Sequence, residues 1–436
     1  MIPYLSIEHQ KERAGTLVNA IYIYFFLLLF EGALRKWILP GFSDVILLIR
    51  DPVAIYILYA AWKSRVSYLN PYVLFIAVVS LFAFYTAILL GHGNLLIALY
   101  GLRITLIHFP LIFIIGSVLI KEDVDRIARW MIVLCIPMLI LIIVQFYSPQ
   151  TAWINKGVGD SLGGGGFTGA LGYLRPPGTF SFTNGLVLFF TLCSSFIFWS
   201  FTYDVKLPVW VIYTALICLF LSIPFSISRA LLFGILITAF FYLLSSFKYW
   251  LTFLYVIVAM IVVITFINVV GNFEFLETGL EVFKERFNSA NESEGGLDEV
   301  ILNRYLGGLN RALVSAEDYP FWGLGLGLGT NAGSILTTGQ KEFLISEGEW
   351  GRVLGEIGPL LGLVLIITRV VLGMNMLFKS YRQFMQGNML PWLMIGNLLF
   401  YISQGQWAQP TSLGFTVFFG GVLLASVKES TLEFNH

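Results

Sequence analysis

Long apolar runs recur along almost the whole chain, and they constrain its fold more than any other feature. A segment crosses a bilayer as a helix of roughly 17 to 25 apolar residues, because lipid leaves backbone groups no other partners. We count about twelve such runs, of which the last two are short: 16–34, 43–62, 71–90, 95–119, 127–147, 182–201, 208–226, 230–247, 250–270, 355–378, 391–404 and 411–427. The sequence therefore predicts an all-α polytopic membrane protein with about twelve transmembrane helices.

Composition and charge narrow the class further. Of the 436 residues, 57% are hydrophobic and 12% are charged, and the formal net charge is zero. Soluble domains have about a quarter charged residues, and a chain without net positive charge is a poor partner for nucleic acid. Cys135, Cys193 and Cys218 lie inside apolar runs without metal-ligand spacing, so we expect packed or lipid-facing thiols rather than disulfides.

The distribution of basic residues predicts the orientation, because cytoplasmic loops are enriched in lysine and arginine. With a cytoplasmic N-terminus, the inside loops contain Lys11, Arg13, Lys63, Arg65, Lys121, Arg126, Arg129, Lys206, Lys248, Lys379, Arg382 and Lys428. The short outside loops contain only Arg35, Lys36, Lys156, Arg175 and Arg229. Both termini are then cytoplasmic, and residues 148–181 and 271–354 are two long extracytoplasmic segments.

The second of these segments divides the chain unequally. We expect residues 1–270 to form a bundle of nine spans, 271–354 to form a large extracytoplasmic helical loop, and 355–436 to form the C-terminal transmembrane helices. No internal repeat relates these parts, whereas twelve-span carriers are often two similar halves. This asymmetry favours a chemical site carried on a membrane scaffold.

Within the large loop, residues 297–316 have the periodicity of an amphipathic helix. One stripe consists of Leu302, Leu306, Leu309 and Leu313, and the opposite face carries Arg304, Gly307, Gly308 and Arg311. Two interpretations remain open. Bare glycine backbone would let a phosphate ligand approach between two guanidiniums, or the helix lies on the bilayer with a solvated face and a glycine kink.

The rest of the large loop leads into the tenth span. Residues 320–329 alternate glycine and leucine, which predicts a close-packed extended segment rather than a dinucleotide site. Glu347, Glu349, Arg352 and Glu356 follow. A carboxylate at this depth is partly desolvated, which raises its pKa and suits it to act as a general base. Glu349 and Arg352 have the spacing of an ordinary pair, whereas Glu347 has no obvious local partner.

Charged residues also occur near and within the spans. Arg229 lies in a short connection, and Arg175 follows the glycines 163–166, which form either a gate or a plain flexible connector. Asp51 and Arg103 lie at matched depth within their spans, which allows them to pair. His108 is a lone histidine in an apolar run, a position typical of packing.

These features indicate an outward-facing site with several arginines, a candidate base and no metal-ligand cluster. The ordered motifs are 175–180 (RPPGTF), 226–229 (SISR), Arg304 with 320–327 (PFWGLGLG), and 356–362 (EIGPLLG). In this order, and on this topology, they resemble the superfamily of O-antigen ligases and Wzy-type O-antigen polymerases.

The resemblance implies a metal-independent, cofactor-free, inverting glycosyltransferase of the membrane-embedded C-type class. Its substrate would be an undecaprenyl-diphosphate-linked oligosaccharide at the periplasmic face of the bacterial inner membrane. The two arginines that contact the diphosphate in the family match Arg229 and Arg304 best. Arg175 and Arg311 are further candidate contacts. A chain-length regulator and a flippase are expected partners.

One departure from the family concerns Glu347. Ligases carry a histidine nine residues before the Glu-x-Gly segment, where this chain has Glu347, and this favours a polysaccharide polymerase with Glu347 as catalytic base or orienting group. Two alternatives remain. In the first, the chain is a ligase that transfers the glycan to lipid A or another acceptor. In the second, it is a flippase or other transporter of lipid-linked oligosaccharides.

Overall fold

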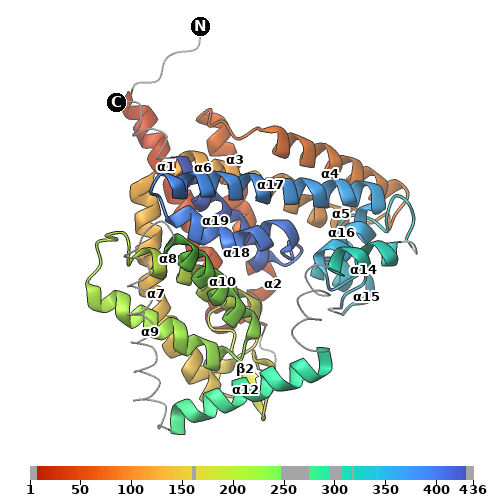
Figure 1. Ribbon diagram of the computed structural model, residues 1–436. Helices are drawn as coiled ribbons and strands as arrows, with labels where there is room; N and C mark the ends of the chain where they lie inside the picture. Colours follow the sequence, from red (N-terminus) through yellow and green to blue (C-terminus); the bar gives the residue numbers. More distant parts are fainter. Residues whose placement is uncertain are drawn as a thin grey trace.

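The computed structural model describes residues 7–159, 164–246, 274–294, 307–316, 319–340 and 342–428. In this part the chain is mainly helical, with one small two-stranded antiparallel sheet (Figure 1). Residues up to 147 form α1 (Ile7–Ala33), η1 (Leu34–Ile38), η2 (Pro40–Phe42), α2 (Ser43–Ile46), α3 (Arg50–Lys63), α4 (Pro71–Leu89), α5 (Leu95–Arg103), η3 (Ile104–His108), α6 (Leu111–Val118) and α7 (Lys121–Tyr147).

The remaining elements include the helices of the two long segments. They are η4 (Trp153–Asn155), β1 (Phe167–Ala170), β2 (Tyr173–Arg175), α8 (Thr183–Trp199), α9 (Val209–Ser226), α10 (Arg229–Ser246), α12 (Glu274–Glu294), α14 (Gly307–Ala316), α15 (Asn331–Thr338), α16 (Glu349–Ile357), α17 (Pro359–Met385), α18 (Leu390–Gln404) and α19 (Pro410–Lys428).

The prediction of an all-α polytopic membrane protein is confirmed at this level. Among the described residues, eight helical segments are long and apolar enough to cross a membrane. The predicted spans at 182–201, 230–247 and 391–404 correspond to the shorter helices α8, α10 and α18. The predicted span at 250–270 lies outside the described residues, so the count of twelve stays a prediction.

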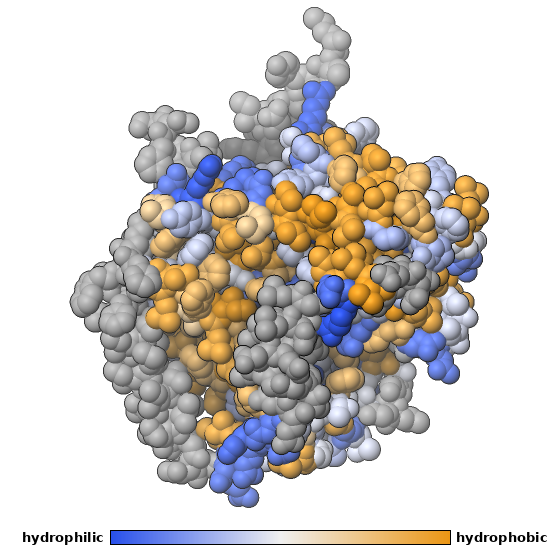
Figure 2. All heavy atoms as spheres, turned by 45° about the vertical axis from the view of Figure 1, so that its right-hand side comes forward, coloured by the Kyte–Doolittle hydropathy of each residue, from blue (hydrophilic) through white to orange (hydrophobic). Residues whose placement is uncertain are grey.

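The surface supports the membrane assignment. Helix α4 exposes a stripe of large apolar side chains at helical spacing: Leu74, Phe75, Val78, Leu81, Phe82, Tyr85 and Leu89. Figure 2 shows hydrophobic residues covering much of one face, with smaller hydrophilic groups mainly toward its edges. Contiguous exposed apolar patches of this size are unusual on soluble proteins, and they suit a helix in contact with lipid.

Hydrogen bonds between loops and neighbouring helix ends fall into two sets, one at each end of the helices. One set is joined by hydrogen bonds from Lys36 to Gly178, Trp322 to Leu90, Trp350 to Ser403 and Gln406 to Glu347. The other set is joined by hydrogen bonds from Tyr22 to Asp123, Ser117 to Ser67 and Lys428 to Ser117. Described parts of both long segments therefore meet at the first end, and which end faces the cytoplasm stays a prediction.

Two of the spans are interrupted where their charged residues lie. The span predicted at 43–62 breaks between α2 and α3, and the span at 95–119 contains the π-helical turn η3 between α5 and α6. Such turns often occur at functional positions in membrane and soluble helices. Here they bring together side chains that would be costly to leave unpaired in lipid.

The predicted pair of Asp51 and Arg103 is confirmed, with 2.5 Å between Oδ2 and Nη1. The other oxygen of Asp51 lies 2.8 Å from Nε2 of His108, whose Nδ1 lies 3.1 Å from the hydroxyl of Tyr24. His108 is thus buried, as expected, within a polar chain. A second buried cluster joins Glu31 to Arg35 and Arg50. Sequence reasoning missed Glu31, although it lies four residues before Arg35 in an apolar run.

The cysteines are packed thiols. Cys135, Cys193 and Cys218 are buried and free, as expected for packed thiols. The described glycines of the loop 163–166 are also held in place: the amides of Gly165 and Gly166 donate to the backbone oxygen of Asn155 and to the side chain of Gln150. These contacts argue against a plain flexible connector, which is one of the two interpretations that the sequence leaves open.

Candidate functional site

The glycine-leucine segment 320–329 forms a series of tight turns rather than the extended segment that was predicted. Gly323, Gly325 and Gly327 have φ angles of 80°, 120° and 90°, which favour glycine. A Cβ atom on Gly327 would lie 2.2 Å from the backbone oxygen of Ile97. The predicted close packing is therefore confirmed, and it fixes this segment against the start of α5.

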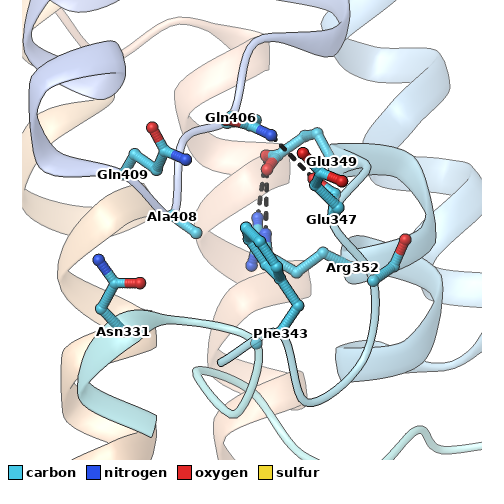
Figure 3. A pocket seen from close by; sticks show the side chains of 10 residues that line it. Asn331, Phe343, Glu347, Glu349, Arg352, Gln406, Ala408 and Gln409 are labelled. Atoms are coloured by element: carbon cyan, nitrogen blue, oxygen red, sulfur yellow. Dashed lines mark hydrogen bonds and ion pairs between the residues drawn. The ribbon is translucent and has the colours of Figure 1, made fainter. Parts of the chain in front are cut away.

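These turns lead into one wall of a cleft (Figure 3). The other walls are the loop before α16 and the turn between α18 and α19, and the cleft is small and partly open to solvent. It is lined by Gly329, Asn331, Phe343, Ser346, Glu347, Glu349, Arg352, Gln406, Ala408 and Gln409. We call it the Glu347 cleft. Its lining combines amides, carboxylates and one phenyl ring, which come from three separate parts of the chain.

Glu347 lies at the edge of this cleft with an exposed side chain. Its backbone oxygen accepts a hydrogen bond of 2.8 Å from Nε2 of Gln406, which fixes the turn before α16. The expectation that Glu347 is partly desolvated is wrong, because the loop carries it outward while α16 carries Glu349 inward. Its carboxylate is accessible from the cleft, as a group that accepts a proton from a substrate must be.

Behind the cleft lies a buried network of charges with opposite signs, which we call the balanced network: Glu349, Arg352, Glu356 and Arg369. Arg352 lies 2.9 Å from Glu349 and 2.6 Å from Glu356, and Arg369 lies 2.6 Å from Glu349. The predicted pairing of Glu349 with Arg352 is confirmed. Glu356 also accepts from the amide of Gly329 at 2.9 Å, so the network holds the glycine turns in place.

The balanced network favours the charged forms of Glu349 and Arg352. Burial acts to raise the pKa of Glu349, but the guanidiniums of Arg352 and Arg369 outweigh it and lower that pKa below its usual value. The two carboxylates beside Arg352 outweigh burial there as well and raise its pKa. Glu349 and Arg352 therefore stabilise each other's charge, which fits a structural role better than proton transfer.

A second group of charges brings arginines together. Arg175, at the end of β2, lies 3.5 Å from Oγ of Ser228, the residue before Arg229 at the start of α10. The two arginines are 54 positions apart in the sequence, and both were predicted as substrate contacts. The structure brings them to the same place at the ends of α9 and α10.

Arg286 is a third member, and we call Arg175, Arg229 and Arg286 the arginine cluster. Burial and the positive charges of Arg286 and Arg229 lower the pKa of Arg175 to about 10, so that Arg175 still carries its charge at neutral pH. Its Nε is buried and makes no hydrogen bond to the described residues. Among these residues, no carboxylate forms an ion pair with Arg175 or Arg286.

Helix α12 carries Arg286, and an aromatic group holds this helix against the bundle. Phe275 packs on Phe225 and Tyr147 with ring centroids 5.0 Å and 5.3 Å apart. Phe146 stacks on Tyr173 of β2 at 4.5 Å. Sequence reasoning missed Arg286, because its neighbours in α12 are mostly polar and resemble a solvated helix face.

The backbone beside the arginine cluster is strained. Ile227 has φ 51° and ψ 38°, a left-handed conformation that is a genuine outlier for a β-branched residue. It ends α9 and orients Ser228 and Arg229 at the start of α10. Strain of this kind costs about 1 to 3 kcal/mol and tends to occur at functional sites.

A chain of contacts connects the arginine cluster to the Glu347 cleft. Arg175 pairs with Phe167 in the β1–β2 ladder, and the Phe167 ring lies 5.1 Å from that of Phe182, just before α8. Asn184, in the first turn of α8, donates to Gln409 of the cleft at 3.4 Å. Both groups therefore lie at the same end of the helices, on adjoining elements.

Two of the predicted substrate contacts belong to the helix region 297–316. Helix α14, which the structure describes from Gly307, packs on α16. Ala312 is buried, and Leu309 and Leu313 pack against the core, which confirms this part of the apolar stripe. Arg311 has an exposed side chain on this helix. Arg304 lies outside the described residues, and its expected meeting with Arg229 stays a prediction.

No group of three histidine, cysteine, aspartate or glutamate side chains that would suit a metal ion occurs among the described residues. Comparisons with protein families, with curated proteins and with solved structures find no match for this chain.

Proposed function

We propose that the protein is a membrane glycosyltransferase, specifically a polysaccharide polymerase. In this proposal it joins undecaprenyl-diphosphate-linked oligosaccharide repeat units at the extracytoplasmic face of the membrane, without a metal ion. The observation that carries the proposal is the arginine cluster. Arg175 and Arg286 form no ion pair with a described carboxylate, and guanidiniums in this setting are suited to bind the diphosphate of a lipid-linked sugar, because each planar group donates two hydrogen bonds at once.

The proposed reaction is a direct displacement with inversion. The acceptor hydroxyl oxygen attacks the anomeric carbon of the donor, and the bond from that carbon to the diphosphate oxygen breaks. The electron pair leaves on the diphosphate, where Arg175 and Arg229 stabilise the added charge. The hydroxyl proton passes to the carboxylate of Glu347.

A transfer assay tests the proposal directly. Purified full-length protein in detergent receives a polyprenyl-diphosphate-linked oligosaccharide in excess EDTA, and the glycan lengths are followed. We expect longer lipid-linked glycans. Absence of elongation contradicts the polymerase proposal, and elongation that stops in EDTA and returns with Mg²⁺ contradicts metal independence.

Substitution of Arg175 tests the role of the arginine cluster. Because a hydrogen bond to a charged group contributes about 1.5 to 3 kcal/mol, Arg175→Gln should lower turnover roughly 10- to 100-fold. Arg175→Lys, which keeps the charge but not the planar fork, should remain impaired. The matched control is Arg126→Gln at the other end of the helices, where the side chain is 54% exposed. Full activity of both Arg175 variants would exclude direct diphosphate contact.

Substitution of Glu347 tests the proposed base. Glu347→Gln keeps the size of the side chain but removes its ability to accept a proton, so turnover should fall by about 10² to 10⁴. Donor binding and expression should stay normal because the side chain is exposed. The control is Glu342→Gln, another exposed carboxylate of the same loop. Near-normal turnover of Glu347→Gln would assign the base elsewhere.

The ligase alternative differs only in the acceptor. Glycan analysis of a deletion strain distinguishes the two, because loss of a polymerase leaves single-repeat lipid-linked intermediates and loss of a ligase leaves long unattached chains. The transporter alternative is favoured by the buried clusters around Asp51 and Glu31, since ionisable groups within spans often mark transport pathways. Elongation in detergent, where no compartments exist, would count against transport as the main activity.

A further inference from the structure

The Glu347 cleft has a chemistry that the proposed transfer does not yet use. Figure 3 shows Asn331 and Gln409 on one side of the cleft, Glu347 on the other, and Phe343 between them. They come from α15, the turn before α19, and the loop before α16. Four side chains from three parts of the chain thus line one small, partly open cleft.

The polar groups of this cleft retain hydrogen-bonding capacity. Gln409 accepts one bond from Asn184, and Gln406 donates one bond to the backbone of Glu347, so each of these amides keeps a second polar atom for a ligand. Amides offer donors and acceptors side by side, while a carboxylate accepts only. This combination suits vicinal hydroxyl groups, which both donate and accept.

Phe343 supplies the apolar part of the cleft. Its ring is 58% exposed although it lines the hollow, so it has a face that the protein leaves uncovered. Ligand sites commonly combine such an aromatic surface with a few convergent polar groups. A pyranose ring has one face of C–H groups that packs on an aromatic ring and a rim of hydroxyls that meets the amides.

The charge of the cleft limits which sugars fit. Arg352 lines the cleft, but Glu349 and Glu356 already hold its guanidinium. With Arg369 also held by Glu349, the cleft and its balanced network contain one more carboxylate than guanidinium, and the exposed one is Glu347. A bound carboxylate would therefore meet repulsion without a free cation among the described lining residues.

We propose that the Glu347 cleft binds an uncharged sugar ring of the acceptor glycan, and that Glu347 excludes rings that carry a carboxylate. The identification of the ring as the acceptor rests on the proposed function, whereas the sugar binding itself does not. The arrangement places the acceptor ring beside the group that takes its proton, with the donor diphosphate held by the arginine cluster.

Matched sugar probes test the proposal. Saturation-transfer NMR on the full-length protein in detergent compares the methyl glycosides of glucose and galactose with those of glucuronic and galacturonic acid, which differ only by a carboxylate. We expect saturation of at least one neutral glycoside and weaker saturation of its acidic counterpart. Equal saturation of both members of each pair, or no saturation of the neutral ones, would overturn the proposal.

Two substitutions sharpen this measurement. Phe343→Ala should abolish binding of the neutral sugar, while Phe321→Ala, another exposed phenylalanine outside the cleft lining, should not. Glu347→Gln should strengthen binding of the acidic sugar roughly fivefold, because one unit charge at about 4 Å in water contributes about 1 kcal/mol. Neutral binding that persists in Phe343→Ala, or acidic binding unchanged in Glu347→Gln, would refute the assignment.

The same variants separate this proposal from the proposed function. If neutral sugars bind as expected but no glycan elongation occurs, the sugar site stands and the polymerase proposal fails. If elongation occurs and Phe343→Ala leaves the KM for the acceptor unchanged, the polymerase proposal is supported and this cleft is not the acceptor site.

Discussion

Arginine side chains occur in two opposite electrostatic settings at the same end of this protein. In the balanced network, Arg352 is buried between Glu349 and Glu356 at distances of 2.9 Å and 2.6 Å. In the arginine cluster, Arg175 has arginine neighbours, and one of its buried nitrogens makes no hydrogen bond within the described residues. The two settings require different explanations, because burial penalises an unpaired charge strongly.

The difference separates charges that stabilise the fold from charges for which we propose a ligand. A buried ion pair within a network satisfies its own charges, and it holds neighbouring backbone, as Glu356 holds Gly329. A cluster of like charges raises the free energy of the folded protein, and an anion would lower it. The strained Ile227 beside the arginine cluster adds to that cost. We infer that the balanced network is structural and that the arginine cluster is a binding site.

The largest effect should follow from breaking the balanced network. Arg352→Ala leaves two carboxylates buried without their main partner, and such changes destabilise proteins by about 3 to 5 kcal/mol. We expect a large fall in the thermal unfolding temperature in detergent and little folded protein on size-exclusion chromatography. The double variant Arg352→Ala with Glu356→Gln should recover part of the loss, because it removes one stranded charge. Wild-type stability of Arg352→Ala would show that the network contributes nothing to the fold.

A smaller effect should appear in the dependence of stability on pH. Since the folded-state pKa of Glu349 lies below its usual value of 4.5, the stability it contributes is complete above about 4.5 and is lost as the pH falls through the folded-state pKa. The unfolding temperature should therefore fall in acid for the wild type and fall less steeply for Glu349→Gln. Glu347→Gln, which removes an exposed carboxylate of the same loop, serves as the control. Identical acid profiles for the wild type and Glu349→Gln would contradict the pairing.

Sequence reasoning reached the class of the fold because its signal is local. Apolar runs predict helices whatever their neighbours are, and the matched depth of Asp51 and Arg103 was enough to predict their pair. It missed Arg369, although a lone arginine in an apolar run indicates a buried partner. The partner, Glu349, lies 20 positions away on another helix, so the pairing depends on how α16 and α17 pack.

The candidate site was predicted in part for the same reason. Arg175 and Arg229 stood out as isolated charges near spans, whereas Arg286 was hidden among the polar residues of α12. Glu347 was identified as a carboxylate without an obvious local partner, and it forms no ion pair with the described residues, but its exposure was not foreseen. A single residue, Gly348, separates Glu347 from Glu349, and the start of α16 at Glu349 decides which of the two carboxylates turns inward.

The smallest expected effect is the change in stability when Arg175 of the arginine cluster is replaced. Unlike the replacement of Arg352, it should not lower the free energy of unfolding appreciably. Arg175→Gln removes repulsion from Arg286 and Arg229, so the unfolding free energy should change by less than about 0.5 kcal/mol, or rise. Inorganic pyrophosphate at a concentration equal to its Kd should stabilise the wild type by about 0.4 kcal/mol and should not stabilise the variant. The measurement is thermal unfolding with and without pyrophosphate, with Arg126→Gln as the control. A loss of stability like that expected for Arg352→Ala would mean that Arg175 is structural, and the contrast between the two regions would then disappear.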